Sequence, residues 1–450
     1  MENPLDWWNL EAPRYTSYPS AHHFSPAMDG NWHAERLAAM TEATHVSAYI
    51  HIPFCKELCW FCGCHTKMTK RYEPIARYVR VLVKELEIIR GFTGGRGKLN
   101  GIHFGGGSPS LLERSDLLAI LYALASAFTH DPSGEFAMEL DPRTTTAENI
   151  KLYAELGCNR VSIGIQDFND EVQRAINRLQ PFAMVASVMD TIRRAGIKGI
   201  NCDLIYGLPH QTRERFLRTL EMTVALAPSR IALFSYAHMP HLKKHQRLIE
   251  ASWLPSEREK VELYALAGEF LASAGYVAVG IDHFARPSDT LAAAASSGTL
   301  RRNFQGYVTD DTEVLVGVGS SAISQFPGGY IQNSANTPDY SARVERGILP
   351  SVRGWRHGGD DQARKHIIDE LMCFMKADVE KACRAFALPK DYFADEILEI
   401  RELERRHGII ACEDGRNVVV TSPHRMAARI AASVFDRYRH AAAGKYSRVA

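Results

Sequence analysis

The chain has 450 residues, and its 53 Lys and Arg residues against 52 Asp and Glu residues leave a formal net charge of +1. This balance argues against a general nucleic-acid binder, which would carry a basic stripe. No apolar run approaches the roughly 20 residues that a membrane helix needs. The acidic start, MENPLDWWNLEAPRY, lacks the basic region and apolar core of a signal peptide. We therefore expect a cytoplasmic protein with one large and one smaller domain.

The first 40 residues show no regular strand–helix pattern, and we expect residues 1–40 to form an N-terminal extension. Its segment RYTSYPSAHHFS, at 14–25, is rich in turn formers but also carries three aromatic residues, two histidines and one arginine. That composition is poor for a solvated tail. We predict that this segment covers the active site, folding over the mouth of the large domain when substrate binds.

The large domain, 41–359, alternates short apolar runs with amphipathic stretches. The six candidate strands are 46–52, 98–104, 135–140, 160–165, 198–206 and 230–236. Six strand–helix units in series predict a parallel sheet with right-handed crossovers. Such units fit either an open sheet or an incomplete barrel, and the periodicity does not choose between them.

Helices are predicted between these strands because apolar residues recur every three or four positions, for example over 75–89 and 184–192. Gly196 follows the second stretch where the end of a helix favours glycine. Thr212 and Ser256 each precede a further helical stretch in the N-cap position.

Four cysteines follow the first predicted strand, and Cys55, Cys59 and Cys62 have the spacing C-x3-C-x2-C. A [4Fe–4S] cubane takes four ligands, so three thiolates leave one iron for a small chelating molecule. A structural zinc site is the alternative, but zinc usually draws on two separated cysteine pairs. A disulfide framework is disfavoured because the chain has nine cysteines and those outside this loop are scattered.

Polar residues and glycines gather where the predicted strands end, the edge at which such folds place their chemistry. Glu139 and Asp203 stand inside otherwise apolar strands. Burying a lone carboxylate is costly, so we expect both to face a polar ligand rather than a distant arginine. Arg178 has the pattern of a solvated helix residue, and His51 that of a satisfied core histidine.

The C-terminal region, 360–450, reads as helix, helix, a β-hairpin turning at 414–415, and a final helix. This order is winged-helix-like. Four arginines in and after its last predicted helix would suit DNA contact, although we expect them to form a solvated basic face; they are Arg425, Arg429, Arg437 and Arg439.

The cysteine loop resembles that of the radical S-adenosylmethionine superfamily. Over nearly its whole length the chain is similar to the family of oxygen-independent coproporphyrinogen III oxidases. The similar stretches are 13–25, 51–64, 104–110, 162–178, 203–212, 235–240, 282–292, 302–307 and the terminal YSRV at 446–449. RYTSYP, Cys64 and NFQGY favour this family within the superfamily. The resemblance implies an α/β fold with an incomplete (βα)6 barrel of the TIM type and a smaller, mostly helical, winged-helix-like C-terminal domain.

The resemblance also implies roles for individual residues. Cys55, Cys59 and Cys62 would hold a [4Fe–4S] cluster, with Cys64 close by but not a ligand. Contacts to the S-adenosylmethionine on the cluster are implied for Tyr49, Gly106, Glu139 and Ile323. Contacts to a second S-adenosylmethionine are implied for Phe61, Gly107, Ser108, Gln166, Arg178, Asp203 and Ala237. Phe304 and Gln305 would line the same cavity, and Tyr49, Phe304 and Gln305 are the candidate catalytic residues.

The activity implied is decarboxylation of two propionates of coproporphyrinogen III to vinyl groups by a 5′-deoxyadenosyl radical, in haem biosynthesis. The electron donor and acceptor are not identified by the sequence, neither nucleic acid nor membrane is an expected partner, and the family favours a monomer. Three alternatives remain open. They are a haem-handling relative, a radical methyltransferase or cyclopropanase, and a zinc-stabilised regulatory protein using the C-terminal wing.

Overall fold

A twelve-stranded sheet forms the larger part of the molecule, in the order β16-β15-β14-β13-β1-β4-β5-β6-β7-β8-β10-β9. The structure is a computed structural model that describes residues 6–439 and 449. The mutually parallel strands are β13 (Val314–Val318), β1 (His45–Ile52), β4 (Lys98–Gly106), β5 (Thr129–Leu140), β6 (Arg160–Gln166), β7 (Gly199–Tyr206) and β8 (Arg230–Ser235). Antiparallel strands extend both edges: β14 (Ile323–Phe326), β15 (Gly329–Asn333) and β16 (Ser351–Arg356), and β10 (His283–Ala285) and β9 (Val277–Val279). The edge strands β16 and β9 do not pair with each other, so the barrel is incomplete.

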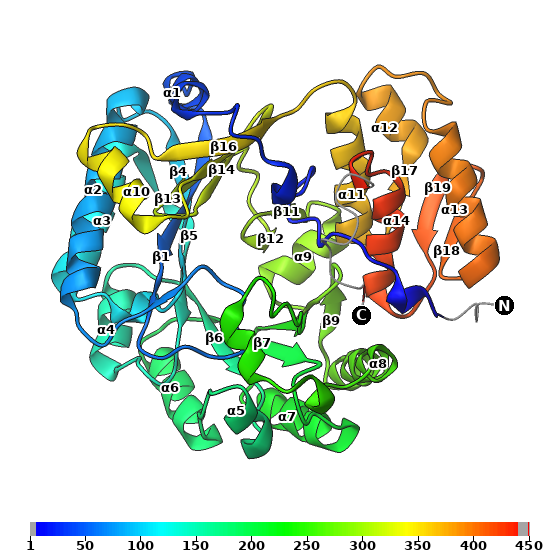
Figure 1. Cartoon of the computed structure of the whole chain (residues 1–450), viewed down its shortest axis with the longest axis horizontal. Coiled ribbons are helices and arrows are strands. Elements are labelled where there is room, and N and C mark those ends of the chain that lie inside the picture. The colour runs from blue at the N-terminus through cyan, green and yellow to red at the C-terminus, as the bar shows by residue number, and fades with distance from the viewer. Residues whose placement is uncertain (1–5, 440–448, 450) are drawn as a thin grey trace.

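Helices cover the outer face of this sheet (Figure 1). They are α2 (Glu73–Thr93), α3 (Arg114–Ala127), α4 (Ala147–Glu155), α5 (Asp170–Ala175), α6 (Phe182–Arg194), α7 (Arg213–Ala225) and α8 (Glu257–Ser273). The remaining elements of the large domain are α1 (Gly30–Ala38), α9 (Thr290–Ser297), α10 (Thr337–Glu345), β2 (Phe54–Cys55), β3 (Lys67–Met68), β11 (Arg301–Asn303) and β12 (Gly306–Val308). Short 3-10 turns occupy Asp6–Asn9, Ala21–His23, Pro109–Leu111, Lys244–Leu248, Ala251–Trp253 and Arg425–Ala427. No described helix is both long and apolar enough to cross a membrane.

All six predicted strands are present, and the predicted helix ends are confirmed. The Thr212 side chain accepts a hydrogen bond from the backbone of Arg215, and Ser256 forms a capping box with Glu259. Gly196 adopts φ +90° just after α6, a conformation that L side chains rarely adopt. The sequence missed β13, which is entirely buried and pairs in parallel with β1.

The C-terminal region contains the predicted hairpin and helices. Strands β18 (Ile410–Glu413) and β19 (Asn417–Val420) form the hairpin, and β17 (Lys376–Asp378) pairs beside it. The helices are α11 (Asp361–Phe374), α12 (Val379–Ala385), α13 (Ala394–His407) and α14 (Ala428–Val434). They pack to the right of the barrel in Figure 1.

The prediction that the arginines of the C-terminal region form a solvated basic face is wrong. Arg429 is 1% exposed and donates from Nε to Pro13 O (3.1 Å). Arg437 pairs with Asp360 at 2.6 Å, and Arg439 pairs with Glu399 at 2.6 Å. Arg425 donates to Gly280 O. These cations bind the C-terminal region to itself, to the barrel and to the N-terminal segment, because acids and carbonyls remote in the sequence meet them.

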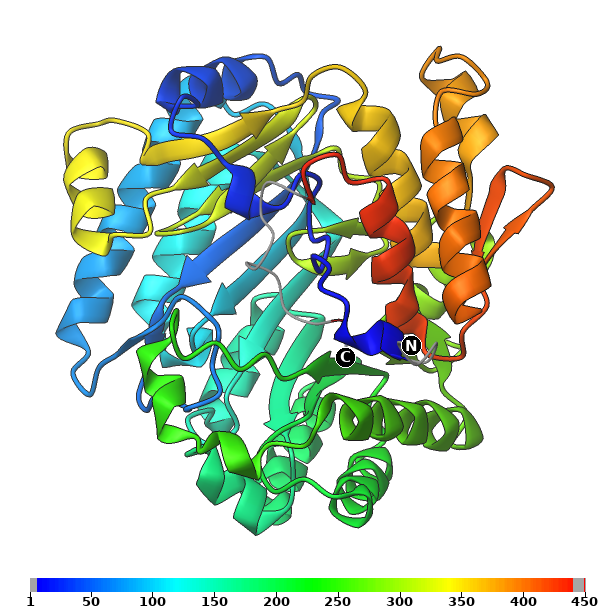
Figure 2. The ribbon, with the colours of Figure 1, turned by 45° about the vertical axis from the view of Figure 1, so that its right-hand side comes forward.

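The N-terminal segment lies between the barrel and α14, as Figures 1 and 2 both show. Tyr15 and Tyr18 are buried, and Tyr15 Oη donates to Asp436 at 3.1 Å. Arg302, from β11, donates to the carbonyls of Arg14 and Tyr15, both at 3.1 Å. The terminal motif at 446–449 lies outside the described residues except for residue 449, whose N–H donates to the carbonyl of residue 10 (3.0 Å).

A buried carboxylate, Glu85 of α2, joins this helix to the β13–β15 part of the sheet. Glu85 accepts from Gly319 N (2.8 Å), Asn333 Nδ2 (2.7 Å) and Tyr340 Oη (2.6 Å). Burial raises the pKa of Glu85 to about 7 in spite of these three donors. The folded protein therefore binds a proton more tightly than the unfolded chain does, and folding stability falls as pH rises from about 4.5 to about 7.

We expect Glu85→Gln to flatten that part of the stability profile, by about 1 kcal/mol per pH unit at its steepest. The amide keeps the size of the side chain but does not titrate. Urea unfolding between pH 5 and 8 measures the effect, with Glu87→Gln on the exposed face of α2 as the control. Parallel profiles for wild type and Glu85→Gln would contradict this assignment.

Candidate active site

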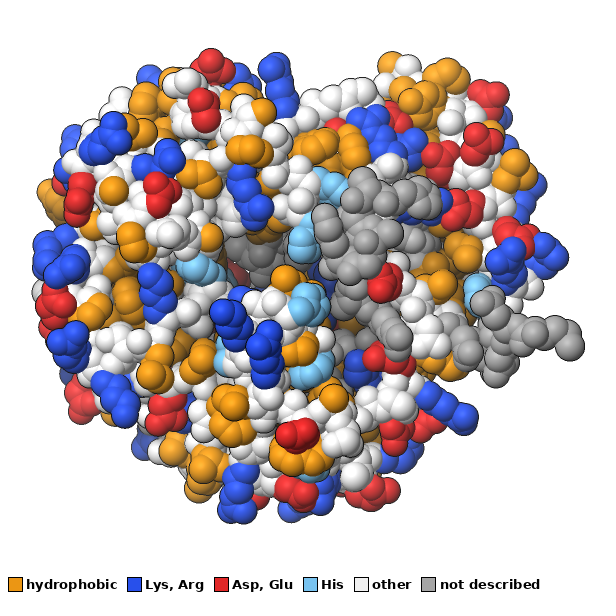
Figure 3. Space-filling view, in the orientation of Figure 1, with side chains coloured by type: hydrophobic (Ala, Val, Ile, Leu, Met, Phe, Trp, Pro, Cys, Tyr) orange, Lys and Arg blue, Asp and Glu red, His pale blue; other side chains and the backbone are white. Residues whose placement is uncertain are grey.

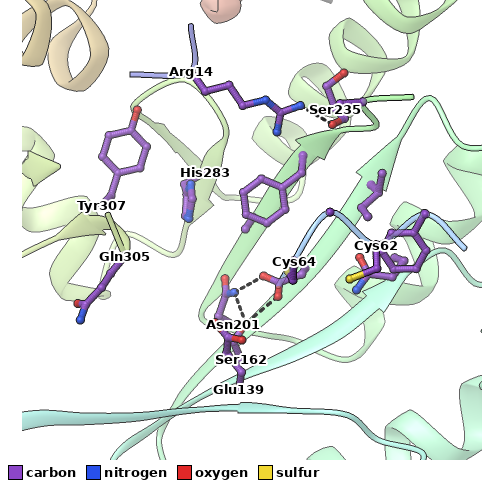
Figure 4. Close-up of a pocket in the computed structure, with 18 of the residues that line it drawn as sticks. Arg14, Cys62, Cys64, Glu139, Ser162, Asn201, Ser235, His283, Gln305 and Tyr307 are labelled. Atoms are coloured by element: carbon purple, nitrogen blue, oxygen red, sulfur yellow. Dashed lines mark hydrogen bonds between the residues drawn. The ribbon is translucent and has the colours of Figure 1, made fainter. Parts of the chain in front are cut away.

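Two adjoining cavities lie where the parallel strands end, inside the incomplete barrel. The main cavity has a volume of about 540 Å³, and the cluster-side cavity, next to the cysteine loop, has a volume of about 170 Å³. The molecular surface is hollowed near the middle of the face in Figure 3, and basic and histidine side chains lie beside the hollow. Figure 4 shows the main cavity, with Arg14 entering from the N-terminal segment and Cys62 and Cys64 on the opposite side.

The cysteine loop follows β1 and brings four thiols to the cluster-side cavity: Cys55, Cys59, Cys62 and Cys64. Cys59 is buried, and Cys64 is exposed toward the cavities. Burial raises the pKa of Cys55 to about 11, whereas a hydrogen bond with Cys64 lowers that of Cys62. Within the described residues no three His, Cys, Asp or Glu side chains converge on a single ion position. A cubane does not require such convergence, because each thiolate binds a different iron.

The glycine run at the end of β4 packs its backbone directly against the cysteine loop. Gly107 N donates to Ile52 O (2.9 Å) and Ser108 N to Phe54 O (2.7 Å). A Cβ on Gly107 would lie 2.5 Å from Phe54 O, so a side chain does not fit there. The N–H of Gly106 donates to Glu139, so all three N–H groups of residues 106–108 are bonded within the protein. An amine ligand here would instead donate to carbonyl or carboxylate oxygen atoms.

Two guanidinium groups face the sulfur of Cys59. Arg143 Nη2 is 3.3 Å and Arg178 Nη1 is 3.5 Å from Cys59 Sγ. Both arginines pair with Asp141, at 2.7 and 3.5 Å. Burial would raise the pKa of Asp141, but these cations hold it below its usual range. Arg143 Nη1 and Arg178 Nε have no hydrogen-bond partner among the described residues. This cationic, under-satisfied wall suits an anionic thiolate-bound cluster and the carboxylate of a chelating ligand, so the residues fit the group that the cysteine spacing predicts.

Glu139 forms the wall between the two cavities. Its carboxylate accepts from Gly106 N (3.0 Å) and lies 3.2 Å from His103 Nε2. Burial would raise the pKa of Glu139, but His103 and the Gly106 N–H lower it overall. No arginine pairs with it in the described structure, and a charged carboxylate therefore faces the cavity, as the sequence predicted.

Asp203 is held by its neighbours on the same side of the sheet. Ser162 Oγ donates to it at 3.0 Å and Asn201 Nδ2 at 2.7 Å. Burial and the nearby charge of Glu139 raise the pKa of Asp203 to about 6. Asn201 Oδ1 has no hydrogen-bond partner among the described residues and belongs to a side chain that lines the main cavity.

Most of the residues singled out by the sequence lie on these cavities. The cluster-side cavity is lined by Cys55, Cys59, Phe61, Cys62, Gly106, Gly107, Ser108, Glu139, Gln166, Arg178 and Asp203. The main cavity adds Ala237 and Gln305. Arg178 is 7% exposed and lies after α5, so the solvated-helix interpretation of this residue is wrong. His51 is a satisfied core histidine as predicted, in contact with Tyr49 Oη (3.1 Å) and His65 O (3.0 Å).

Three predicted residues do not line either cavity. Tyr49 stacks on His103 at 5.7 Å between ring centres. His103 in turn contacts Glu139, so Tyr49 reaches this carboxylate only through the histidine. The ring of Phe304 packs edge-on against Tyr330 at 5.4 Å. Ile323 begins β14, which lies between β13 and β15 in the sheet.

Sequence reasoning missed Arg143, Ser162, Asn201 and His283, all of which line one of the cavities. Strand alternation could have found Asn201, because it lies two residues before Asp203 and so faces the same side of β7. Arg143 gives no such signal, since it follows β5 in an irregular turn.

A loop with the spacing C-x3-C-x2-C, placed at the end of the first strand of an incomplete parallel barrel, defines a radical S-adenosylmethionine enzyme. In agreement, the sequence model described as "Radical SAM superfamily" matches residues 49–223. The chain is 42% identical to "Oxygen-independent coproporphyrinogen III oxidase" of Bradyrhizobium diazoefficiens, covering 95% of this chain and 94% of that protein. It is 39% identical to the protein of the same name from Pseudomonas aeruginosa, covering 96% and 94%.

Among solved structures, the chain is similar to the coproporphyrinogen III oxidase HemN of Escherichia coli, described as a radical SAM enzyme. The TM-score is 0.89 at 34% identity, covering 95% of this chain and 98% of that one. The chain belongs to the family of oxygen-independent coproporphyrinogen III oxidases.

Proposed function

We propose that this chain converts two propionate side chains of coproporphyrinogen III to vinyl groups without oxygen, forming protoporphyrinogen IX in haem biosynthesis. The observation that carries the proposal is that the cysteine loop, Glu139, Asp203 and the cationic Arg14 surround adjoining cavities. The family membership and the names of the relatives support the same substrate.

In this proposal Cys55, Cys59 and Cys62 hold a [4Fe–4S] cluster. When bound, the cluster and S-adenosylmethionine supply the one-electron chemistry that attacks an unactivated C–H bond. Gly106 and Glu139 would hold the amino and hydroxyl groups of the cofactor, with Tyr49 behind Glu139 and Ile323 at the start of β14. The buried walls exclude water from the reacting groups.

A second S-adenosylmethionine is proposed beside the first. Its contacts would come from Phe61, Gly107, Ser108, Gln166, Arg178, Asp203 and Ala237. All of these residues line one or both cavities, which supports a shared binding volume. Ser162 and Asn201 fix the carboxyl group of Asp203 for this contact.

We expect Asp203→Ala to retain the cluster and some cofactor cleavage but to lose vinyl formation by about 100-fold, the value of one or two hydrogen bonds to a charged group. The measurement is anaerobic turnover with separate quantification of deoxyadenosine and vinyl product. Asp190→Ala, on the exposed side of α6, is the control. Unchanged vinyl yield in Asp203→Ala would remove this residue from the site.

The substrate would occupy the main cavity. Arg14 donates from Nη2 to Ser235 O (2.8 Å) and lines this cavity, so its remaining N–H groups can bind a propionate carboxylate. Gln305 contributes an amide nitrogen without a partner among the described residues. Each propionate loses CO2, one hydrogen atom and one electron, and becomes vinyl. Phe304 is proposed to support the Gln305 turn through its contact with Tyr330.

The test is anaerobic incubation of the reconstituted protein with coproporphyrinogen III, S-adenosylmethionine and dithionite, followed by chromatography of the oxidised porphyrins. We expect the three-propionate intermediate and then protoporphyrin. A methylated product would favour the methyltransferase alternative, and tight haem binding without turnover would favour the haem-handling one.

We further propose a monomer that works in the cytoplasm, where nine unpaired cysteines are stable, with a separate electron donor and electron acceptor as partners.

A further inference from the structure

We infer that Arg143 is a positioning residue that sets the reduction potential of the cluster through the sulfur of Cys59. The inference rests on the proposed cluster and concerns a residue that the sequence did not single out. Arg143 Nη2 lies 3.3 Å from Cys59 Sγ, within hydrogen-bonding distance of a thiolate. Its side chain is only 12% exposed, so solvent screens this contact weakly.

The guanidinium of Arg143 is fixed from behind. Nε donates to Asp141 Oδ1 at 3.0 Å and Nη2 to Oδ2 at 2.7 Å, a bidentate geometry. The backbone N–H of Arg143 donates to the same carboxylate at 3.0 Å. The turn after β5 thus holds the guanidinium group of Arg143 in one orientation against the cysteine loop. This orientation does not depend on a bound ligand.

The two charged groups in direct contact with Cys59 Sγ are both cations. Arg178 adds a second guanidinium at 3.5 Å, and its other arm is bonded to Gly164 O (2.7 Å). Against these two cations stand Asp141, which both share, and Glu57, which is 3.6 Å from Arg143 Nη1 but whose side chain is 65% exposed. Hydrogen bonds and positive charge at a ligand sulfur stabilise the more negative, reduced cluster, so they raise its reduction potential.

Replacing Arg143 by glutamine removes the charge while keeping a polar side chain. We expect Arg143→Gln to retain iron and sulfide and to lower the midpoint potential, with at least a tenfold shift of the one-electron equilibrium, or about 59 mV. Anaerobic redox titration followed by electron paramagnetic resonance measures this on the protein without porphyrinogen. Arg77→Gln, whose side chain is 71% exposed on α2, is the control and should keep the wild-type potential.

Arg143→Lys is the second variant, because it keeps a charge but loses the planar fork that reaches both Asp141 and Cys59. We expect a downward shift smaller than that of Arg143→Gln. A wild-type midpoint potential in Arg143→Gln would contradict the inference. If Arg143→Gln does not retain iron, the test passes to Arg143→Lys, and a wild-type midpoint potential in that variant would contradict the inference. A wild-type protein that takes up no [4Fe–4S] cluster would instead contradict the proposed function.

Discussion

Cys59→Ser should give a folded protein that holds no catalytic cluster and forms no vinyl product. Serine is close to cysteine in size, so the buried site at 7% exposure is filled and the melting temperature should change by only a few degrees. Its hydroxyl is not deprotonated near neutral pH, and iron–sulfur clusters are held by soft thiolates. Two thiolates would remain, and we expect them to lose the cubane to oxygen and chelators.

The measurement is iron and sulfide content after anaerobic reconstitution, together with deoxyadenosine formation. Cys64→Ser is the matched control, since it changes a thiol in the same loop that is exposed rather than buried. Cys64→Ser should keep its iron. If Cys59→Ser retained full iron and cleaved S-adenosylmethionine, the assignment of the three ligands would be wrong.

Removal of the N-terminal segment should have the second large effect. Deleting residues 1–25 takes away Arg14 and the buried rings of Tyr15 and Tyr18. We expect decarboxylation to be abolished while the cluster is retained, because the cysteines lie on the loop after β1. The truncation should also lower the free energy of unfolding, because each buried aromatic side chain that is lost removes about 3 kcal/mol or more of stability. The sequence composition alone does not show that these rings are buried.

A point variant separates substrate contact from stability. Arg14→Gln keeps the segment and its buried rings, so it should melt near the wild-type temperature yet lose about 10- to 100-fold in turnover, the value of hydrogen bonds to a charged carboxylate. Asn9→Ala, exposed in the same segment, is the control. Wild-type turnover in both the truncation and Arg14→Gln would show that the segment does not contact substrate.

The strands of the barrel could be predicted because each is a short apolar run bounded by glycine, proline or polar residues. Strand β13 could not, since its pairing with β1 joins residues more than 260 positions apart and follows an irregular stretch. The same distance in sequence explains the arginine error. Arg429 and Arg437 look like a solvated basic face until the fold brings Pro13 O and Asp360 to them.

The candidate site divides in the same way. The cysteine loop is visible in the sequence from its spacing, and Glu139 and Asp203 are visible as carboxylates in otherwise apolar strands. The structure places all of them on the cluster-side cavity. Arg178 was found only through resemblance, because its burial against Gly164 O depends on the turn after α5. Arg143 was missed, because the amino-acid sequence alone does not show that this arginine, two residues after Asp141, contacts Cys59, which lies 84 positions earlier.

The central claim is that these cavities decarboxylate two propionates of one macrocycle without oxygen. Coproporphyrinogen III labelled in its propionate carboxyl groups tests this directly, by counting labelled CO2 released under anaerobic conditions. We predict two equivalents of CO2 for each protoporphyrinogen IX formed, and none from Cys59→Ser. Consumption of S-adenosylmethionine by the wild-type protein with no labelled CO2 would contradict the account.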